Sequence, residues 1–266
     1  MANVPEILND YLLFCSYRQK CSKSKVLNLR DCKWIYPTTL LPLSIFIKEN
    51  KDQFEYQAPL DHNLSNYINV ATGELSAEFS EIKPHIPLVV LPKDQKQSSA
   101  ILEYIFQFNH NGDEYGGENA FKYLIEELVD NIYEHSQFTH ALVMAQKYEK
   151  KNFVEISFFD DGISIPGSFE NQGMKFEDQQ AIVKAVNGLS TKSEERGYGL
   201  NSNLKIFTQG LGGEILIVSR SGALHVSKKL QRLYNLRDIN KLNGTLISIR
   251  IPYPTTKFDI FQEGYL

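Results

Sequence analysis

The sequence predicts an α+β protein, with a small N-terminal α/β domain ahead of a larger unit of helices layered on a sheet. Three observations support this prediction. Residues 118–137 repeat apolar side chains at three- and four-residue spacing, as in a helix with one buried stripe. Residues 140–149 and 152–162 have the pattern of two strands joined by a lysine-rich hairpin. Two more strands are expected over 215–222 and 244–252, so strands and helices do not alternate as in a βαβ protein.

The predicted N-terminal domain spans residues 1–95, and its elements are short. Pro37 suits the first turn of a helix, where a missing backbone N–H costs nothing. The order of strand, proline-led helix and later short helix over 25–75 is similar to that of STAS-like domains. Strands are expected over 25–35, 53–59 and 86–92, and helices over 37–50 and 60–75.

The predicted second domain spans residues 96–256, and residues 257–266 form a C-terminal tail. It opens with a serine-capped helix over 98–108, and a loop over 109–117 follows. Compositional balance places the whole chain among ordinary globular proteins, because 42% of the residues are hydrophobic and 23% are charged.

Charge and cysteine usage exclude several classes of protein. The 28 basic and 32 acidic residues give a formal net charge of −4, so non-specific nucleic-acid binding is not indicated. The basic stretch over 227–237 is open to two interpretations, a local basic patch or a solvated helix face. No signal-peptide pattern is present, and no apolar run approaches the roughly 20 residues of a membrane helix. Cys15, Cys21 and Cys32 have neither disulfide nor zinc-site spacing, so we expect reduced thiols in a cytoplasmic protein.

Polar residues cluster on one edge of the helix predicted over 118–137. Glu127, Asn131, Glu134 and His135 stand at positions i, i+4, i+7 and i+8 and therefore share that edge. A carboxylate and an amide oxygen one turn apart suit a magnesium ion and an attacking water. Taken alone, the same residues describe the solvated face of any surface helix, and that interpretation is the better one.

Two glycine-containing motifs follow. In "FFDDGISIPG", Asp160 ends a strand, where it can accept a hydrogen bond from the amine of adenine, and Gly162 permits a tight turn. In "RGYGLNSNLKIF", Gly197 and Gly199 open a helix whose first N–H groups can face an anion. Each motif by itself also fits a plain turn or a flexible loop ahead of a helix.

In this order and spacing, the three motifs resemble those of the GHKL ATPase superfamily, which includes gyrase B subunits, the large heat-shock chaperones, histidine kinases and MutL. "ELVDNIYEH" resembles the N box, "DDGISIPG" the G1 box and "RGYGL" the G2 box, over roughly residues 100–252. The resemblance implies the Bergerat fold, a layer of helices over a mixed sheet with ATP and Mg²⁺ bound between the helices and a mobile lid.

The resemblance also implies a role for individual residues. Glu127 would be the base or water-positioning carboxylate, and Asn131 the Mg²⁺ ligand. Asp160 would contact the adenine amine with Gly162 beside it, and Ser164 stands where the family pattern has its second glycine, although serine disfavours a positive φ angle. The phosphate end of the site would hold Thr191, Lys192, Arg196, Gly197, Gly199 and Leu200.

Three functions are consistent with these motifs. The favoured one is a Mg²⁺-dependent ATPase switch, in which ATP closes a lid over 168–196 and changes binding to a protein partner. The second is a serine/threonine kinase of the anti-sigma-factor type, which would phosphorylate a partner. The third is a non-enzymatic nucleotide-binding module. A homodimer is compatible with all three, whereas a histidine-kinase dimerisation hairpin is missing from the N-terminal half.

Overall fold

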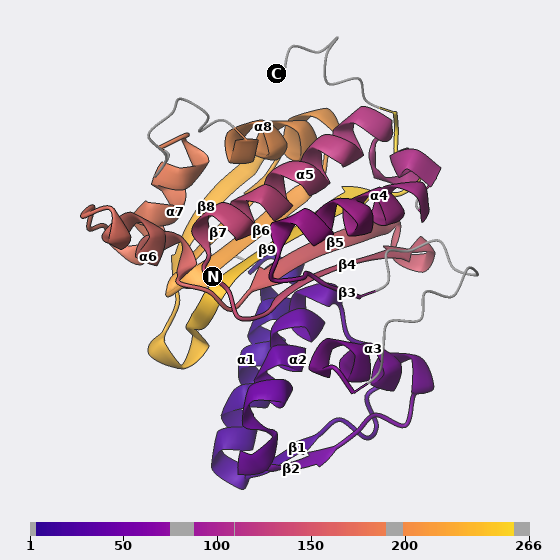
Figure 1. Cartoon of the computed structure of the whole chain (residues 1–266), viewed down its shortest axis with the longest axis vertical. Coiled ribbons are helices and arrows are strands. Elements are labelled where there is room, and N and C mark those ends of the chain that lie inside the picture. The colour runs from indigo at the N-terminus through magenta and orange to yellow at the C-terminus, as the bar shows by residue number, and fades with distance from the viewer. Residues whose placement is uncertain (1–3, 75–87, 109, 190–198, 258–266) are drawn as a thin grey trace.

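The protein is a mixed α+β structure built on one large sheet that helices cover on both faces (Figure 1). The computed structural model describes residues 4–74, 88–108, 110–189 and 199–257. Within these residues no helix is long and apolar enough to cross a membrane. The predicted α+β class is confirmed by this arrangement.

The large sheet has seven strands in the order β3-β4-β5-β9-β6-β7-β8. Every described pair in it is antiparallel, so the prediction of a mixed sheet is wrong for this sheet. The last strand, β9, lies in the centre between β5 and β6, and its register places Thr245 opposite Asp160. The strands are β3 (Val89–Val90), β4 (Ala141–Tyr148), β5 (Phe153–Asp160), β6 (Glu214–Arg220), β7 (Gly222–Ser227), β8 (Leu230–Asn235) and β9 (Leu242–Pro252).

Helix α5 (Glu118–His135) crosses one face of this sheet and confirms the strongest helix prediction. Its stripe of Phe121, Leu124, Leu128 and Val129 is buried in a core shared with the strands, which is why the polar residues are left on the opposite edge. The same side of the sheet carries α4 (Ser98–Phe108), α6 (Ser164–Asn171), α7 (Asp178–Val186) and α8 (Gly199–Lys205), which continues as a π-helical turn (Ile206–Gly210).

The N-terminal helices cover the other face of the sheet. Helix α2 (Pro37–Asn50) is apolar along most of its length and packs against β4, β5 and β9. A second core therefore joins α1 (Glu6–Ser24), α2 and α3 (His62–Thr72) to sheet residues such as Met144 and Phe159. Because both faces are covered, most residues of the central strands are buried, including the polar pairs Glu155–Arg250 and Ser157–Ser248 of β5 and β9. Strands β1 (Val26–Asn28) and β2 (Glu55–Gln57) form a separate parallel pair.

A buried ion-pair network fastens the N-terminal helices to the sheet. Arg250 of β9 donates from Nε to the Glu155 carboxylate of β5 at 2.8 Å, and its Nη2 pairs with Asp10 of α1. Glu155 Oε1 accepts from the backbone N–H and the hydroxyl of Thr38, at 2.9 and 2.7 Å, at the start of α2. Both central partners are buried, with Glu155 at 0% and Arg250 at 4% exposure. The ion pair of Glu155 and Arg250 thus connects four elements, which are α1, α2, β5 and β9.

The structure differs from the sequence predictions in several elements. Residues 227–237 are not a helix face, because they form the end of β7, a turn and strand β8. The predicted loop over 109–117 contains a 3₁₀ helix, His110–Tyr115. Helix α1 was not predicted, although Ile7, Leu8, Tyr11 and Phe14 repeat at helical spacing and are buried. One strand from the predicted first domain, β3, pairs with β4 in the large sheet.

Candidate functional site

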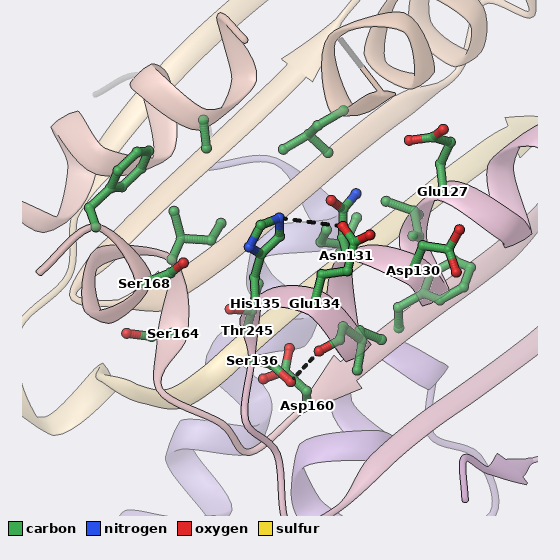
Figure 2. Close-up of a pocket in the computed structure, with 18 of the residues that line it drawn as sticks. Glu127, Asp130, Asn131, Glu134, His135, Ser136, Asp160, Ser164, Ser168 and Thr245 are labelled. Atoms are coloured by element: carbon green, nitrogen blue, oxygen red, sulfur yellow. Dashed lines mark hydrogen bonds and ion pairs between the residues drawn. The ribbon is translucent and has the colours of Figure 1, made fainter. Parts of the chain in front are cut away.

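A cavity of about 230 Å³ lies on the α5 side of the sheet, among α5, α6, α7, α8, the end of β5 and the start of β9 (Figure 2). It is slightly smaller than the roughly 300–1,000 Å³ of typical small-molecule sites. Its polar lining consists of Glu127, Asp130, Asn131, Glu134, His135, Ser136, Asp160, Ser164, Ser168 and Thr245. Its apolar lining includes Ile132, Phe158, Ile165, Phe169, Leu200 and Ile247.

Helix α5 supplies half of the polar lining from a single edge. The residues predicted for this edge, Glu127, Asn131, Glu134 and His135, all line the cavity. His135 Nε2 lies 3.8 Å from Glu134 Oε2. Asp130 was missed by the sequence reasoning, although it stands three residues after Glu127 and four before Glu134 and so shares their edge. Its Oδ1 accepts from Gln95 Nε2 at 3.2 Å.

Asp160 lies at the bottom of the cavity, where β5 ends. The residue is 4% exposed, and the backbone N–H of Gly162 donates to its Oδ1 at 2.9 Å. Burial raises the pKa of this carboxyl to about 7, with the Gly162 N–H opposing the shift and the neighbouring Asp161 charge adding to it. Near neutral pH, Asp160 can therefore either accept a hydrogen bond as a carboxylate or donate one as an acid.

Asp161, the next residue, serves a different part of the structure. Its carboxylate accepts from the backbone N–H groups of Thr139 and His140, at 2.6 and 2.7 Å, and lies 2.7 Å from His140 Nδ1. Glu49 of α2 is close by, with donor atoms of the three residues Glu49, His140 and Asp161 within 4.8 Å of one another. Successive side chains of an extended chain point to opposite sides, so Asp160 points into the cavity whereas Asp161 points toward α2.

Gly162 does not line the cavity, although the sequence predicts it as a ligand contact. A Cβ atom added to it would lie 2.0 Å from the carbonyl oxygen of Ser136 at the end of α5. The neighbouring Ile163 N–H donates to that same oxygen at 2.7 Å. The close approach that requires a glycine is therefore to the backbone of α5, and its contact with a ligand stays a prediction.

Ser164 lines the cavity in a strained backbone conformation. Its φ angle is +75°, in the left-handed region that costs a non-glycine residue about 1–2 kcal/mol. The side chain is buried, and its Oγ accepts from the N–H of Gly167 at 3.3 Å in the first turn of α6. The expectation that serine carries a conformational cost at this position is consistent with this geometry.

The structure describes only part of the third motif. Helix α8 begins at Gly199, and Leu200 lines the cavity. Thr191, Lys192, Arg196 and Gly197 lie outside the described residues. Thr245 was not predicted as a site residue; its Oγ1 lies 3.1 Å from Ser219 Oγ, and only the pairing of β9 with β5 brings it beside Asp160.

The described lining is strongly acidic. Glu127, Asp130, Glu134 and Asp160 contribute four carboxyl groups, and no lysine or arginine lines the cavity within the described residues. A phosphate group would be repelled here unless a cation accompanied it. Oxygen donors on Glu127, Asp130, Asn131 and Glu134 suit a hard cation such as Mg²⁺, which binds a few protein oxygens and keeps several of its waters.

The cavity thus combines an oxygen-rich edge on α5 with an apolar wall and one buried carboxyl. Figure 2 shows Asn131 between Glu127 at one end and Asp160 at the other. Such a site can hold a flat polar ring at the Asp160 end and a cation with an anionic group along α5. A scan against models of known protein families and a search of curated protein sequences gave no match to this chain.

Proposed function

We propose that the cavity binds a magnesium–adenine nucleotide and that the protein is an ATPase of the GHKL type, acting as a conformational switch for a protein partner. The observation that carries the proposal is the meeting of three separate sequence motifs at one cavity. Glu127 and Asn131 on α5, Asp160 after β5 and Leu200 at the start of α8 line the same space. They are far apart in sequence, so chance surface polarity does not bring them together.

In this proposal, Asp160 recognises the base. Its buried carboxylate would accept from the exocyclic amine of adenine, while Phe158, Ile165 and Ile247 offer apolar contacts to the ring. The amine favours the ionised form of Asp160, whose pKa near 7 is raised by burial. Adenine binding below that pH would therefore release a proton.

Along α5, Asn131 would hold Mg²⁺ through its amide oxygen, and Glu127 would orient or deprotonate the attacking water. When bound, the ion would neutralise phosphate charge at an edge that carries the carboxyl groups of Glu127, Asp130 and Glu134. This charge argument supports a strict need for Mg²⁺. Glu127 would move the proton of the water, as a general base within reach of the reacting phosphate must do.

The helical layer over a sheet supports the Bergerat type. The described strand pairs of that sheet are all antiparallel, which departs from it. The lid proposed over 168–196 would include α7 and the second half of α6. A switch is favoured over a simple enzyme because α2 packs on the opposite face of the strand that ends in Asp160. Movement at the cavity could thereby reach the N-terminal helices. Serine/threonine kinase activity on a partner is the second candidate.

Isothermal titration with ATP, ADP and a non-hydrolysable analogue, with and without Mg²⁺, tests the proposal. We expect binding only with Mg²⁺, and proton release measurable by repeating the titration in buffers of different ionisation enthalpy. Glu127→Gln should retain binding and lose hydrolysis, whereas Asp160→Ala should lose binding. Glu126→Gln is the matched control, because Glu126 is a neighbouring exposed carboxylate that pairs with Lys122.

The two enzymatic candidates differ in where the γ-phosphate goes. Phosphate released without a partner supports the ATPase, and label transferred from γ-labelled ATP to a second protein supports the kinase. The absence of nucleotide binding under all these conditions would refute both.

A further inference from the structure

A second surface feature lies in the N-terminal segment, where α1 and β1 meet at the bottom of the view in Figure 1. It is an open groove between the second half of α1, strand β1 and the loop that leads to Trp34. It shares no lining residue with the cavity described above. Its role is therefore independent of the proposed nucleotide site.

The groove is basic in a chain that is acidic overall. Lys20 and Lys23 of α1 and Lys33 of the loop line it, together with a single carboxylate, Asp31. None of these lysines forms an ion pair with another residue in the part of the chain that the structure describes, whereas the formal net charge of the whole chain is −4. Three uncompensated ammonium groups give this groove a local positive potential that attracts carboxylates.

Aromatic groups give the groove a rigid apolar contact. Trp34 is the chain's one tryptophan, and 49% of it is exposed. Its ring is held edge-on against Tyr148 of β4, with 5.2 Å between centroids. Tyr17 stands across from it on α1, its hydroxyl 3.8 Å from Cys32 Sγ. A fixed, half-exposed tryptophan beside a tyrosine is typical of protein interfaces, because little side-chain entropy is lost on contact.

Strand β1 presents a partly open edge to this groove, on which the Ser24 hydroxyl already bonds the backbone N–H and C=O of Val26 at 3.2 and 3.0 Å. Within the described residues it pairs with β2 alone, through bonds that include Glu55 N to Lys25 O and Leu29 N to Gln57 O, both 2.9 Å. In a parallel ladder, alternate residues turn their N–H and C=O groups the other way, which places those of Asn28 on the open side. An extended peptide can add to such an edge.

We propose that this groove binds an extended, acidic segment of a partner protein. The lysines would meet its carboxylates, Trp34 and Tyr17 would cover its apolar side chains, and Asn28 would offer main-chain hydrogen bonds. Nucleic acid is the less favoured occupant, because three lysines are few for a phosphate backbone and the chain as a whole repels it.

Trp34 makes the test direct, because the intrinsic tryptophan fluorescence of the intact chain reports from this groove alone. The probe is a capped peptide of alternating glutamate and valine, and its counterpart has glutamine in place of glutamate. We expect a saturable change in Trp34 emission with the acidic peptide, weakened by added salt and missing with the glutamine peptide. The variant Lys20→Gln/Lys23→Gln/Lys33→Gln should lose about tenfold or more in affinity.

The control variant Lys175→Gln/Lys228→Gln/Lys229→Gln removes the same charge from exposed lysines outside the groove and should bind the peptide as the unaltered chain does. Circular dichroism establishes that both variants are folded. Equal binding by both variants, or no emission change at all, would overturn the proposal. So would a response to oligothymidylate in place of the peptide, or self-association of the chain that the groove variant abolishes.

Discussion

Gly162 packs directly onto the carbonyl oxygen of Ser136, so close that a methyl group on its Cα would lie 2.0 Å from that oxygen. The contact joins the turn after β5 to the C-terminal end of α5. Both sides of the cavity are positioned by it, since Asp160 precedes this turn and His135 precedes Ser136. The distance between Asp160 and the end of α5 therefore depends on the absence of a side chain at Gly162.

Gly162→Ala should destabilise the fold and separate the two halves of the cavity. The backbone of Ser136 cannot move as a side-chain end could, so we expect a loss of about 2–3 kcal/mol in the free energy of unfolding, measured with urea. Gly173→Ala is the matched control. It has a φ of +76° and open space around its Cα, so it should lose only about 1 kcal/mol, from backbone strain. Equal losses in the two variants would contradict the steric explanation.

Ser164→Gly should stabilise the protein. Glycine relieves the φ angle of +75°, and this gain exceeds the greater freedom of glycine in the unfolded chain, giving a net increase of about 0.5–1 kcal/mol. Ser164→Ala keeps the strain and removes only the hydroxyl that accepts from Gly167, so it should be neutral or destabilising. A destabilised Ser164→Gly variant would show that the hydroxyl matters more than the backbone angle. Thermal unfolding measures both variants.

Asp160 should make the ligand-free protein less stable as the pH rises toward neutrality. Its pKa is about 7 in the folded state and 3.8 in the reference state, so the folded protein holds the extra proton between these values. The stabilisation is complete below about pH 4 and is lost as the pH rises through about 7, at about 1.4 kcal/mol per pKa unit and on the order of 4 kcal/mol in total. Asp160→Asn cannot titrate and still accepts from Gly162.

The difference in unfolding free energy between the unaltered chain and Asp160→Asn, measured by urea from pH 4 to 8, isolates this residue from others that titrate. Asp10, for example, has a pKa raised to about 6 by burial and contributes equally to both proteins. A difference that stays constant over this range would show that Asp160 is ionised throughout.

Glu155 and Arg250 should depend on each other. Arg250→Met leaves the Glu155 carboxylate buried without its charge partner and should lose about 3–5 kcal/mol, whereas Glu155→Gln leaves Arg250 still paired with Asp10 and should lose less. The double variant should lose less than the sum of the two, and urea unfolding of all four proteins gives the coupling energy. Additive losses would show that the two side chains act separately.

Local patterns predicted much of the α5 edge. Helix α5 ends within two residues of its predicted end, because the apolar stripe of a helix depends on residues only three or four positions apart in the sequence. The same periodicity places Glu127 and Asn131 on the cavity side. A solvated helix face was one interpretation of the basic stretch over 227–237, yet hydrogen bonding to β7 makes it an edge strand. Tertiary context overrode the local preference there.

The sequence by itself determined the elements that local periodicity encodes, the ordered motifs, and the surface of α5 that carries oxygen ligands. Only the tertiary structure decided that Thr245 lies beside Asp160, because β9 is inserted between β5 and β6. It also decided that Gly162 faces Ser136 and that the N-terminal helices cover the second face of the sheet. These relationships join residues distant in the chain, and they follow from which apolar faces can be buried together rather than from any local spacing.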